Sequence, residues 1–346
     1  MTIKNYLITG GAGFIGSHFA IKIAQLGHKA IVLDALTYAA NMQNLSEIKN
    51  PQKNLDSLKF IKGNIIDQKL INEILVDEKI DYIVHFAAES HVDNSIKSPE
   101  SFIQTNIVGT FNLLNCGLNY WKNLSAEKKS QFRFLHVSTD EVYGSLAESD
   151  PKFTEESSYK PNSPYSASKA ASDHLARAWF ETYSLPVIVT NCSNNFGPHQ
   201  HSEKLIPTII RSAISDKIIP IYGNGKNIRD WIYVKDHADG LFKALHEGRI
   251  GQTYCFGGEC EKTNIEIANK ICEILDVLKP RADKKSYAKQ INFVQDRLGH
   301  DKRYAIDNAK VIAELGYKVS KSFEERLQET VTWFLLGADN LANNKI

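Results

Sequence analysis

The first half of the chain alternates short, almost continuously apolar runs with longer stretches whose apolar residues recur at helical spacing. The apolar runs predict strands at 6–10, 29–34, 58–63, 82–88, 132–138 and 186–193. The longer stretches predict helices at 14–26, 68–78, 99–121 and 165–184. Apolar strands separated by helices are typical of a parallel sheet covered on both faces. The pattern therefore predicts an α/β fold with a Rossmann-type, doubly wound parallel sheet.

The pattern becomes looser after about residue 194, where turn sequences such as NFGP and YGNGKN separate shorter strands. Helices are predicted there at 204–216, 264–276 and 320–335. We therefore expect a larger domain at 1–193 and a smaller C-terminal lobe at 194–346. The segment 229–248 is predicted as a strand followed by a helix with Asp236 as its N-cap. We expect it to return to the main sheet, which makes the two lobes interleaved.

Charge and composition narrow the class of protein. The 41 Lys and Arg residues nearly balance the 40 Asp and Glu residues, so no overall field attracts nucleic acid or an anionic membrane. The N-terminal MTIKNYLITGG lacks the features of a signal peptide, and no apolar run approaches the length of a membrane span. The cysteines form no C-x-x-C pair, which favours reduced thiols: Cys116, Cys192, Cys255, Cys260 and Cys272. A cytoplasmic protein is predicted, with no nucleic-acid or membrane partner.

A glycine-rich turn, GGAGFIG, joins the first predicted strand to the first predicted helix. It reads as G-x-x-G-x-x-G through Gly10, Gly13 and Gly16, or as G-x-G-x-x-G when Gly11 replaces Gly10. Such glycines let the backbone and the helix N-terminus approach a pyrophosphate. Asp34 ends the second strand, where an acid binds both ribose hydroxyls and repels the 2′-phosphate of NADP. The sequence thus predicts NAD as the cofactor, although the motif alone also fits an ordinary loop.

The carboxyl ends of the next two strands carry small or polar residues. Asn64 follows the third strand, where it either hydrogen-bonds adenine or occupies a turn. The run FAA, at 86–88, lets the middle of the cofactor pass close to the fourth strand. Ser90 and His91 are expected at the rim of that site.

The sequence YSASK places Tyr165 and Lys169 four residues apart, on one face of a predicted helix. A phenol is a weak base at neutral pH. A nearby ammonium and the positive nicotinamide of NAD stabilise the phenolate, so we expect the pKa of Tyr165 to be lowered. Tyr165 then accepts the proton of an alcohol while the alcohol carbon loses a hydride to NAD. Alone, this spacing is common on helix surfaces; beside the glycine loop and Asp34 it predicts a redox site.

The segment STDEVYG follows another buried strand and places a hydroxyl and two carboxyl groups side by side, in Thr139, Asp140 and Glu141. It lies at the carboxyl end of a strand, where ligands bind in parallel sheets. Crowded carboxyls titrate as a pair, so one shared proton provides an acid and a base near neutral pH. Spacing does not decide which of the two holds that proton. The competing interpretation is an acidic pair that caps the next turn.

These motifs, together with FIQTNIVGT at 102–110, TNCSNNFGP at 190–198 and PIYGNGKNIRDWIYVKDHA at 220–238, resemble the extended short-chain dehydrogenase/reductases. Within that family the likeness is to the dTDP-glucose 4,6-dehydratases, because T-D-E after this strand is a specific feature. The likeness runs from residue 7 to about residue 307.

The resemblance implies a lyase that forms a 4-keto-6-deoxy sugar from a nucleotide-linked glucose. In such a reaction C4 is oxidised, water is lost across C5 and C6, and the hydride returns to C6, which leaves NAD unchanged. The resemblance assigns Asp140 as the acid and Glu141 as the base, with Thr139 binding the C4 oxygen and Tyr165 and Lys169 as the redox pair.

The resemblance also implies the ligand-binding residues. The NAD-binding domain at 1–193, with Asn195 from beyond it, is expected to hold the cofactor through Gly10, Gly13, Phe14, Ile15, Gly16, Asp34, Ala35, Leu36, Thr37, Asn64, Ile65, Phe86, Ala87, Ala88, Ser90, Thr105, Tyr165 and Lys169. The sugar-nucleotide-binding lobe at 194–346, with Ser90 and Thr139, is expected to hold the substrate through Asn194, Lys204, Leu205, Pro220, Ile221, Tyr222, Arg229, Asn264, Asp296, Arg297 and His300. The HQH at 199–201 lacks the spacing and the companion ligands of a metal site, so no metal is predicted.

Two other functions remain open at this point. A nucleotide-sugar 4-epimerase or decarboxylase shares the glycine loop, Asp34 and the Tyr-Lys pair, but has no use for Asp140 as an acid. A module that senses NAD without turnover is expected to lack Tyr165 or Lys169, and both are present. The resemblance implies dTDP as the nucleotide, with UDP left open. It also implies a homodimer, because the predicted helices at 99–121 and 165–184 carry apolar residues beyond one face.

Overall fold

A seven-stranded sheet forms the centre of the molecule. The computed structural model describes residues 2–48 and 57–343. All strand pairs of this sheet are parallel, in the order β10-β6-β5-β4-β1-β2-β3. The strands are β1 (Asn5–Thr9), β2 (Lys29–Asp34), β3 (Leu58–Lys62), β4 (Tyr82–His85), β5 (Arg133–Val137), β6 (Val187–Cys192) and β10 (Thr253–Phe256). The order reverses beside β1, which is where such sheets bind ligands. The predicted Rossmann-type fold class is confirmed.

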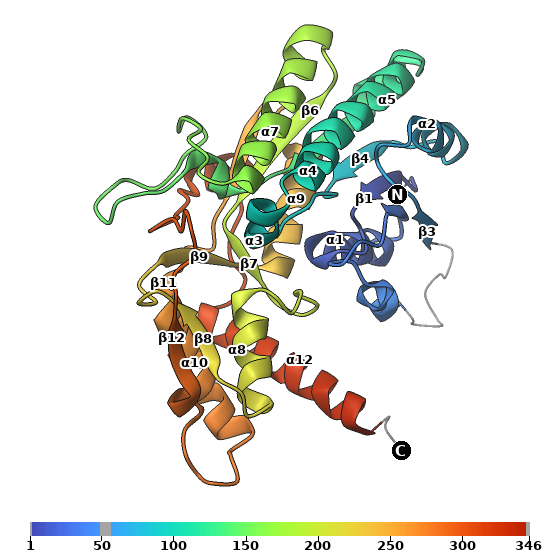
Figure 1. Cartoon of the computed structure of the whole chain (residues 1–346). Helices are drawn as coiled ribbons and strands as arrows, with labels where there is room; N and C mark the ends of the chain where they lie inside the picture. The colour runs from blue at the N-terminus through green and yellow to red at the C-terminus, as the bar shows by residue number, and fades with distance from the viewer. Residues whose placement is uncertain (1, 49–56, 344–346) are drawn as a thin grey trace.

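Helices cover both faces of this sheet, and each face has its own apolar core. On one face, Phe19 and Ile23 of α1 and Leu241 of α9 pack against the sheet. On the other face, the core includes Leu75 of α2 and Leu113 of α5. Figure 1 shows α5 and α7 side by side at the top of the molecule. These helices are α1 (Phe14–Gln25), α2 (Gln68–Asp77), α5 (Thr110–Lys122), α7 (Pro164–Tyr183), α9 (Val234–Glu247) and α11 (Ala309–Leu315).

The helix predicted at 99–121 contains a stretch of π-helix. It consists of α4 (Glu100–Phe102), the π-helical η3 (Ile103–Gly109) and then α5. The Asn106 carboxamide receives a hydrogen bond from the Glu89 backbone N–H at 2.9 Å and donates to the Ser168 hydroxyl at 2.8 Å. Such π-helical turns occur mostly at functional sites, and this one faces the loop that follows β4.

The C-terminal part of the chain forms a second cluster of strands and helices, yellow to red in the lower half of Figure 1. Its sheets have the orders β11-β9-β7 and β12-β8. Helices α8, α10 and α12 pack around a separate core that includes Ile210, Ile271 and Val331. The elements are β7 (Asn194–Phe196), α8 (Leu205–Ile214), β8 (Ile219–Tyr222), β9 (Ile228–Tyr233), β11 (Glu261–Thr263), α10 (Asn264–Leu278), β12 (Ile291–Val294) and α12 (Phe323–Asn343).

The segment 229–248 differs from its prediction in two respects. Its strand, β9, belongs to the small three-stranded sheet, and only its helix, α9, packs on the main sheet. The unpredicted strand β10 is what joins the main sheet, beside β6. Asp236 is not the N-cap: the helix begins at Val234 after an extended Tyr233, and the Asp236 carboxylate instead accepts a hydrogen bond from the Ser320 hydroxyl at 2.5 Å. The division of the chain at residue 194 stays a prediction.

The remaining short helices lie in connections. They are η1 (Met42–Ile48), α3 (Val92–Lys97), α6 (Ala126–Gln131), η4 (Asp140–Tyr143) and η5 (Tyr287–Gln290). Within the described ranges, no helix has the length and apolar character needed to cross a membrane. The thiols of all five cysteines are free.

Candidate active site

A cavity of about 300 Å³ lies at the carboxyl ends of the main-sheet strands. Residues following β1 to β6 line it, together with the start of α7 and the loop before α8. It brings together all five predicted catalytic residues: Thr139, Asp140, Glu141, Tyr165 and Lys169. It also includes most of the predicted cofactor residues: Gly10, Gly13, Phe14, Ile15, Gly16, Asp34, Ala35, Thr37, Asn64, Ile65, Phe86, Ala87, Ala88, Ser90, Thr105 and Asn195.

The glycine loop leaves room that side chains would fill. Gly10 has a φ of +70°, and a Cβ there would lie 2.6 Å from the backbone nitrogen of Ala87. A Cβ on Gly16 would collide with the carbonyl oxygen of Gly10. The first N–H groups of a helix have no acceptor within it, and the first turn of α1 lines the cavity. The loop therefore offers N–H donors and close backbone approach, which fit a pyrophosphate.

Asp34 is held at the end of β2 by the backbone around the glycine loop. Its carboxylate accepts hydrogen bonds from the N–H of Ala12 at 2.9 Å and of Leu36 at 2.8 Å. Burial raises its pKa, and these two hydrogen bonds act in the opposite direction. Each oxygen retains a lone pair for a ribose hydroxyl. The glycine loop and Asp34 together form a site that fits NAD.

Asp140 is an almost unsolvated acid. It is 2% exposed, one oxygen accepts a long hydrogen bond of 3.4 Å from the Thr139 hydroxyl, and the other has no hydrogen-bond partner in the described part of the chain. Burial, followed by the negative charges of Glu141 and Asp230, raises its pKa well above the ordinary range. Burial and these charges therefore favour the protonated form of Asp140.

Glu141 is in a different electrostatic environment although it is the next residue. Burial raises its pKa, but the positive charges of Arg297, Lys204 and Arg229 lower it. These three cations favour the carboxylate form of Glu141, which favours Asp140 as the group that holds the shared proton. The assignment of acid and base stays a prediction.

Tyr165 lines the same cavity. Burial raises the pKa of its phenol well above 10, and the charges of Glu141 and Cys192 add to that effect. A hydrogen bond with Thr139 acts in the opposite direction. Among the residues of the chain, desolvation outweighs any effect of Lys169 on this pKa. The predicted lowering also depended on the positive nicotinamide of NAD, and it stays a prediction.

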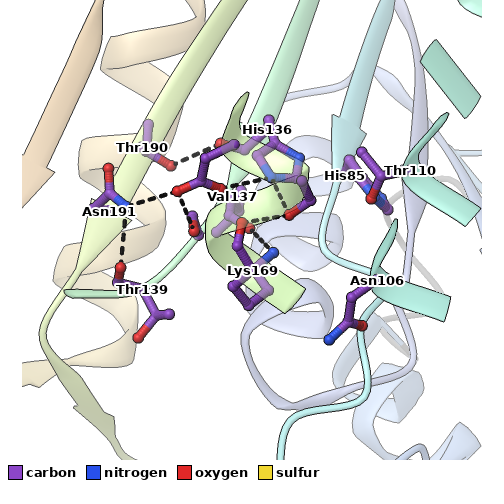
Figure 2. Close-up of polar contacts among 12 residues, drawn as sticks. His85, Asn106, Thr110, His136, Val137, Thr139, Lys169, Thr190 and Asn191 are labelled. Atoms are coloured by element: carbon purple, nitrogen blue, oxygen red, sulfur yellow. Dashed lines mark hydrogen bonds and ion pairs between the residues drawn. The ribbon is translucent and has the colours of Figure 1, made fainter. Parts of the chain in front are cut away.

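Lys169 is buried in the wall of the cavity. Its ammonium donates a hydrogen bond to the Val137 carbonyl at 2.9 Å, at the end of β5 (Figure 2). Burial lowers its pKa, and the negative charge of Asp173 is the largest influence that raises it. The ammonium is thus tied to the same strand end that carries the acidic pair.

The predicted substrate residues are divided between the cavity and its surroundings. Ser90, Thr139, Asn194 and Lys204 line the cavity, and Lys204 donates to the Ser90 carbonyl at 3.0 Å. The other predicted substrate residues lie outside the lining: Leu205, Pro220, Ile221, Tyr222, Arg229, Asn264, Asp296, Arg297 and His300. Among them, Arg229 and Arg297 still act on Glu141 through their charges. Their contact with a substrate stays a prediction.

Ile221 and Leu36 are held by apolar packing. Ile221 is fully buried in the core of the C-terminal lobe. The predicted cofactor residue Leu36 is also outside the cavity lining, since its side chain packs against the main core. The backbone N–H of Leu36 nevertheless contributes to the site, because it donates a hydrogen bond to the Asp34 carboxylate.

Several lining residues were not predicted. Most come from the loops that carry the predicted residues: Leu33, Ala39, Ala40, Gly63, Glu89, Val137, Ser138, Cys192, Ser193, Gln200, His201 and Glu203. These residues lie close in sequence to predicted site residues, and that proximity was the signal that could have identified them. His201 lies 3.5 Å from the Glu203 carboxylate. In the described ranges, no group of three or more His, Cys, Asp and Glu side chains is arranged to hold a metal ion.

Comparison with known proteins identifies the family. The family described as GDP-mannose 4,6 dehydratase matches residues 7–330. The chain belongs to this family. Within it, the dTDP-glucose 4,6-dehydratase of Xanthomonas campestris pv. campestris (strain B100) is 50% identical over 333 residues, covering 96% of this chain and 93% of the relative. The resemblance inferred from T-D-E and Y-x-x-x-K is thereby confirmed.

Solved structures of family members and epimerases share the fold. DesIV, a dTDP-glucose 4,6-dehydratase from Streptomyces venezuelae crystallised with NAD, is 41% identical with a TM-score of 0.85, covering 97% of this chain and 98% of that one. The UDP-glucose 4-epimerase of Thermotoga maritima has a TM-score of 0.84 but only 25% identity, covering 96% of this chain and 99% of that one. The fold alone therefore does not separate the two activities, whereas sequence identity favours the dehydratases.

Proposed function

We propose that this chain is a hydro-lyase that converts dTDP-glucose to dTDP-4-keto-6-deoxyglucose, with NAD as a cofactor that is regenerated in each turnover. The observation that carries this proposal is the buried pair of Asp140 and Glu141 in the same cavity as Tyr165 and Lys169. Relatives named dTDP-glucose 4,6-dehydratase, at 50% and 41% identity over nearly the whole chain, support it. The NAD in the DesIV structure supports the cofactor.

The first step is oxidation of the sugar at C4. NAD, when bound, supplies the acceptor for the C4 hydride and later its donor at C6. Tyr165 takes the proton of the C4 hydroxyl, which requires the phenolate. Since its phenol pKa is raised by burial, a positive charge must be present for this step, and Lys169 provides one in the wall of the cavity. Thr139, hydrogen-bonded to Tyr165, orients the C4 oxygen.

The second step is loss of water. The C4 ketone acidifies the hydrogen on C5, and Glu141 removes it as the carboxylate. Asp140, protonated because of its burial and the charge of Glu141, gives its proton to the departing C6 hydroxyl. When the hydride returns to C6, Glu141 returns its proton to C5. The pair thus provides the acid and the base that a simple oxidation does not need.

After each turnover, Tyr165 carries one extra proton and Asp140 lacks one. Thr139 is hydrogen-bonded to both: it donates to Asp140 at 3.4 Å and is paired with the Tyr165 phenol. We propose that this proton returns through the Thr139 hydroxyl.

The decisive experiment incubates the purified protein with NAD and either dTDP-glucose or UDP-glucose, and follows product mass. Loss of one water from dTDP-glucose is expected, with slower or no loss from UDP-glucose. A product of unchanged mass would instead indicate the 4-epimerase. That outcome would reject the proposed function, because an epimerase leaves Asp140 without a role.

We also propose a homodimer through the outer face of α5 and α7, the dimer face. Ile103, Val108, Phe111 and Tyr183 are large apolar side chains exposed on η3, α5 and α7. The ring centroids of Phe111 and Trp179 lie 5.7 Å apart, which joins the two helices into one surface. The same face of a second copy of this chain covers it, so that two helices from each copy meet at the interface. A cytoplasmic location stays a prediction.

The dimer is tested by replacing Phe111 with Asp and measuring mass in solution by light scattering. The variant is expected to have half the mass of the unmodified protein, because a carboxylate at the centre of the dimer face must be desolvated. Val277→Asp is the matched control, since Val277 is exposed on α10. A Phe111→Asp variant whose mass equals that of the control would reject this interface.

A further inference from the structure

Asp173 is a buried carboxylate outside the cavity, two helical turns after Tyr165 on α7. It is 3% exposed and accepts four side-chain hydrogen bonds. The His136 ring donates through Nε2 at 3.0 Å and the Ser138 hydroxyl at 2.8 Å. The Tyr159 hydroxyl donates at 2.9 Å and the Asn191 amide at 3.2 Å. Such a set of donors stabilises the ionised form.

The donors connect Asp173 to the strand end that carries the acidic pair. Ser138 is the residue before Thr139, so its bond fixes the start of the T-D-E segment. The Asn191 amide bonds both Asp173 and the Thr139 carbonyl, the latter at 3.0 Å (Figure 2). On the other side, Lys169 is bonded to the Val137 carbonyl. Side chains of α7 and β6 therefore form hydrogen bonds with three consecutive residues, 137, 138 and 139.

Asp173 also supplies charge to the buried Lys169. The two residues are one helical turn apart on α7, and Lys169 is only 4% exposed. A buried ammonium loses its proton easily unless an anion lies nearby. The Asp173 charge is the largest influence that favours the ammonium form. Burial and the charge of Lys169 lower the pKa of the nearby His136 ring, although its hydrogen bond with Asp173 acts in the opposite direction.

We propose that Asp173 is a positioning residue, which keeps Lys169 as an ammonium ion and fixes the backbone beneath Thr139 without touching substrate or cofactor. This inference rests on the proposed function only in that it concerns the C4 oxidation step. It predicts that loss of the Asp173 charge slows C4 oxidation, while binding of the sugar nucleotide, most of whose predicted contacts lie in the C-terminal lobe, changes little.

The test compares Asp173→Asn with Asp239→Asn. The control removes an aspartate charge from an exposed ion pair, 2.7 Å from Lys22, on the opposite face of the sheet. Single-turnover C4 oxidation is followed by the absorbance of reduced cofactor in an Asp140→Asn, Glu141→Gln background, where the later steps are blocked. We expect Asp173→Asn to slow this oxidation roughly 10- to 100-fold, with the Kd for dTDP-glucose and the amount of bound NAD within about twofold of the control.

A rate within about twofold of the control, in a folded Asp173→Asn protein, would overturn the proposal. If Asp173→Asn does not fold, Ser138→Ala decides, because it keeps the charge and removes one donor bond to it. A several-fold slower oxidation at unchanged Kd for dTDP-glucose and unchanged melting temperature supports the proposal, and an unchanged rate overturns it. Failure of the proposed function is a separate result, since the unmodified protein would then release no water from dTDP-glucose.

Discussion

Asp140 and Asp173 flank the same strand end and are buried to almost the same extent, 2% and 3% exposed, yet their charges differ. Asp140 has one long hydrogen bond and an oxygen without a partner in the described chain, and burial raises its pKa. Asp173 has four donors; although burial acts to raise its pKa, the bonds from His136 and Ser138 and the charge of Lys169 bring it below the ordinary value.

This difference shows that burial alone does not decide whether a carboxyl group is an acid or an anion. The hydrogen-bond donors and the charges around it also decide. On the cavity side Asp140 has few donors and negative neighbours, which favour the protonated form that the proposed mechanism needs. On the helix side the fold supplies donors, and the charge becomes a permanent part of the structure.

The largest expected effect comes from removing the acidic pair itself. Asp140→Asn with Glu141→Gln keeps the shape of both side chains and removes the acid and the base. We expect product formation to fall by roughly 10³-fold or more, while C4 oxidation persists and reduced cofactor accumulates. Mass analysis of the product and absorbance of the cofactor measure the two steps. Near-native dehydration in this variant would show that the buried pair is not the acid and base.

The two aspartates should also affect stability in opposite directions. The folded pKa of Asp140 is raised, so its stabilising effect is complete below the unfolded pKa of about 4 and is lost as pH rises. Asp140→Asn is therefore expected to increase the free energy of unfolding at neutral and alkaline pH, by about 1 kcal/mol or more. The gain should disappear at acidic pH.

Asp173→Asn is the counterpart. The folded pKa of Asp173 is lowered, so its stabilising effect is present above the unfolded pKa and is lost as pH falls through the folded pKa. We expect this variant to lower the free energy of unfolding by about 2 kcal/mol at neutral pH. Urea unfolding of both variants across a pH series measures the effect. Shifts of the same sign in both variants would contradict the contrast between the two carboxyl groups.

The smallest expected effect comes from removing a single donor. Tyr159→Phe deletes the hydroxyl that bonds Asp173 at 2.9 Å and leaves the carboxylate with His136, Ser138 and Asn191. The expected loss in the free energy of unfolding is ~1 kcal/mol, measured by urea unfolding at neutral pH. A loss as large as that of Asp173→Asn would mean that one donor, and not the set, maintains the charge.

The main sheet could be predicted from the sequence because its strands are buried on both faces. The run at 29–34 matches β2, and the run at 6–10 matches β1 to within one residue at each end. β10 was missed because it has only four residues, at the edge of the sheet and in the region where apolar periodicity is weak. The N-cap at Asp236 was wrong because the chain enters α9 directly from a strand, where no capping side chain is used.

The composition of the site was predictable, and its electrostatics were only partly so. Glycine spacing, Asp34 and T-D-E are local signals, and each follows a strand whose end forms the cavity. The pKa of Tyr165 depends on burial and on the charge of Glu141, which is distant in sequence, so a local argument from Lys169 could not include these two effects. Asp173 carried no motif of its own, because its role depends on residues from β5, β6 and a loop that only the fold brings together.

The direct passage from β9 into α9 has a consequence for how the base is prepared. β9 lies in the C-terminal lobe and carries Arg229, whereas α9, starting at the very next residue after β9, packs on the main sheet. The Arg229 guanidinium donates a hydrogen bond to the Asp301 carbonyl at 3.0 Å, and its charge lowers the pKa of Glu141. If Glu141 is the base, as proposed, the scaffold supplies part of the electrostatic field at the base before the substrate binds.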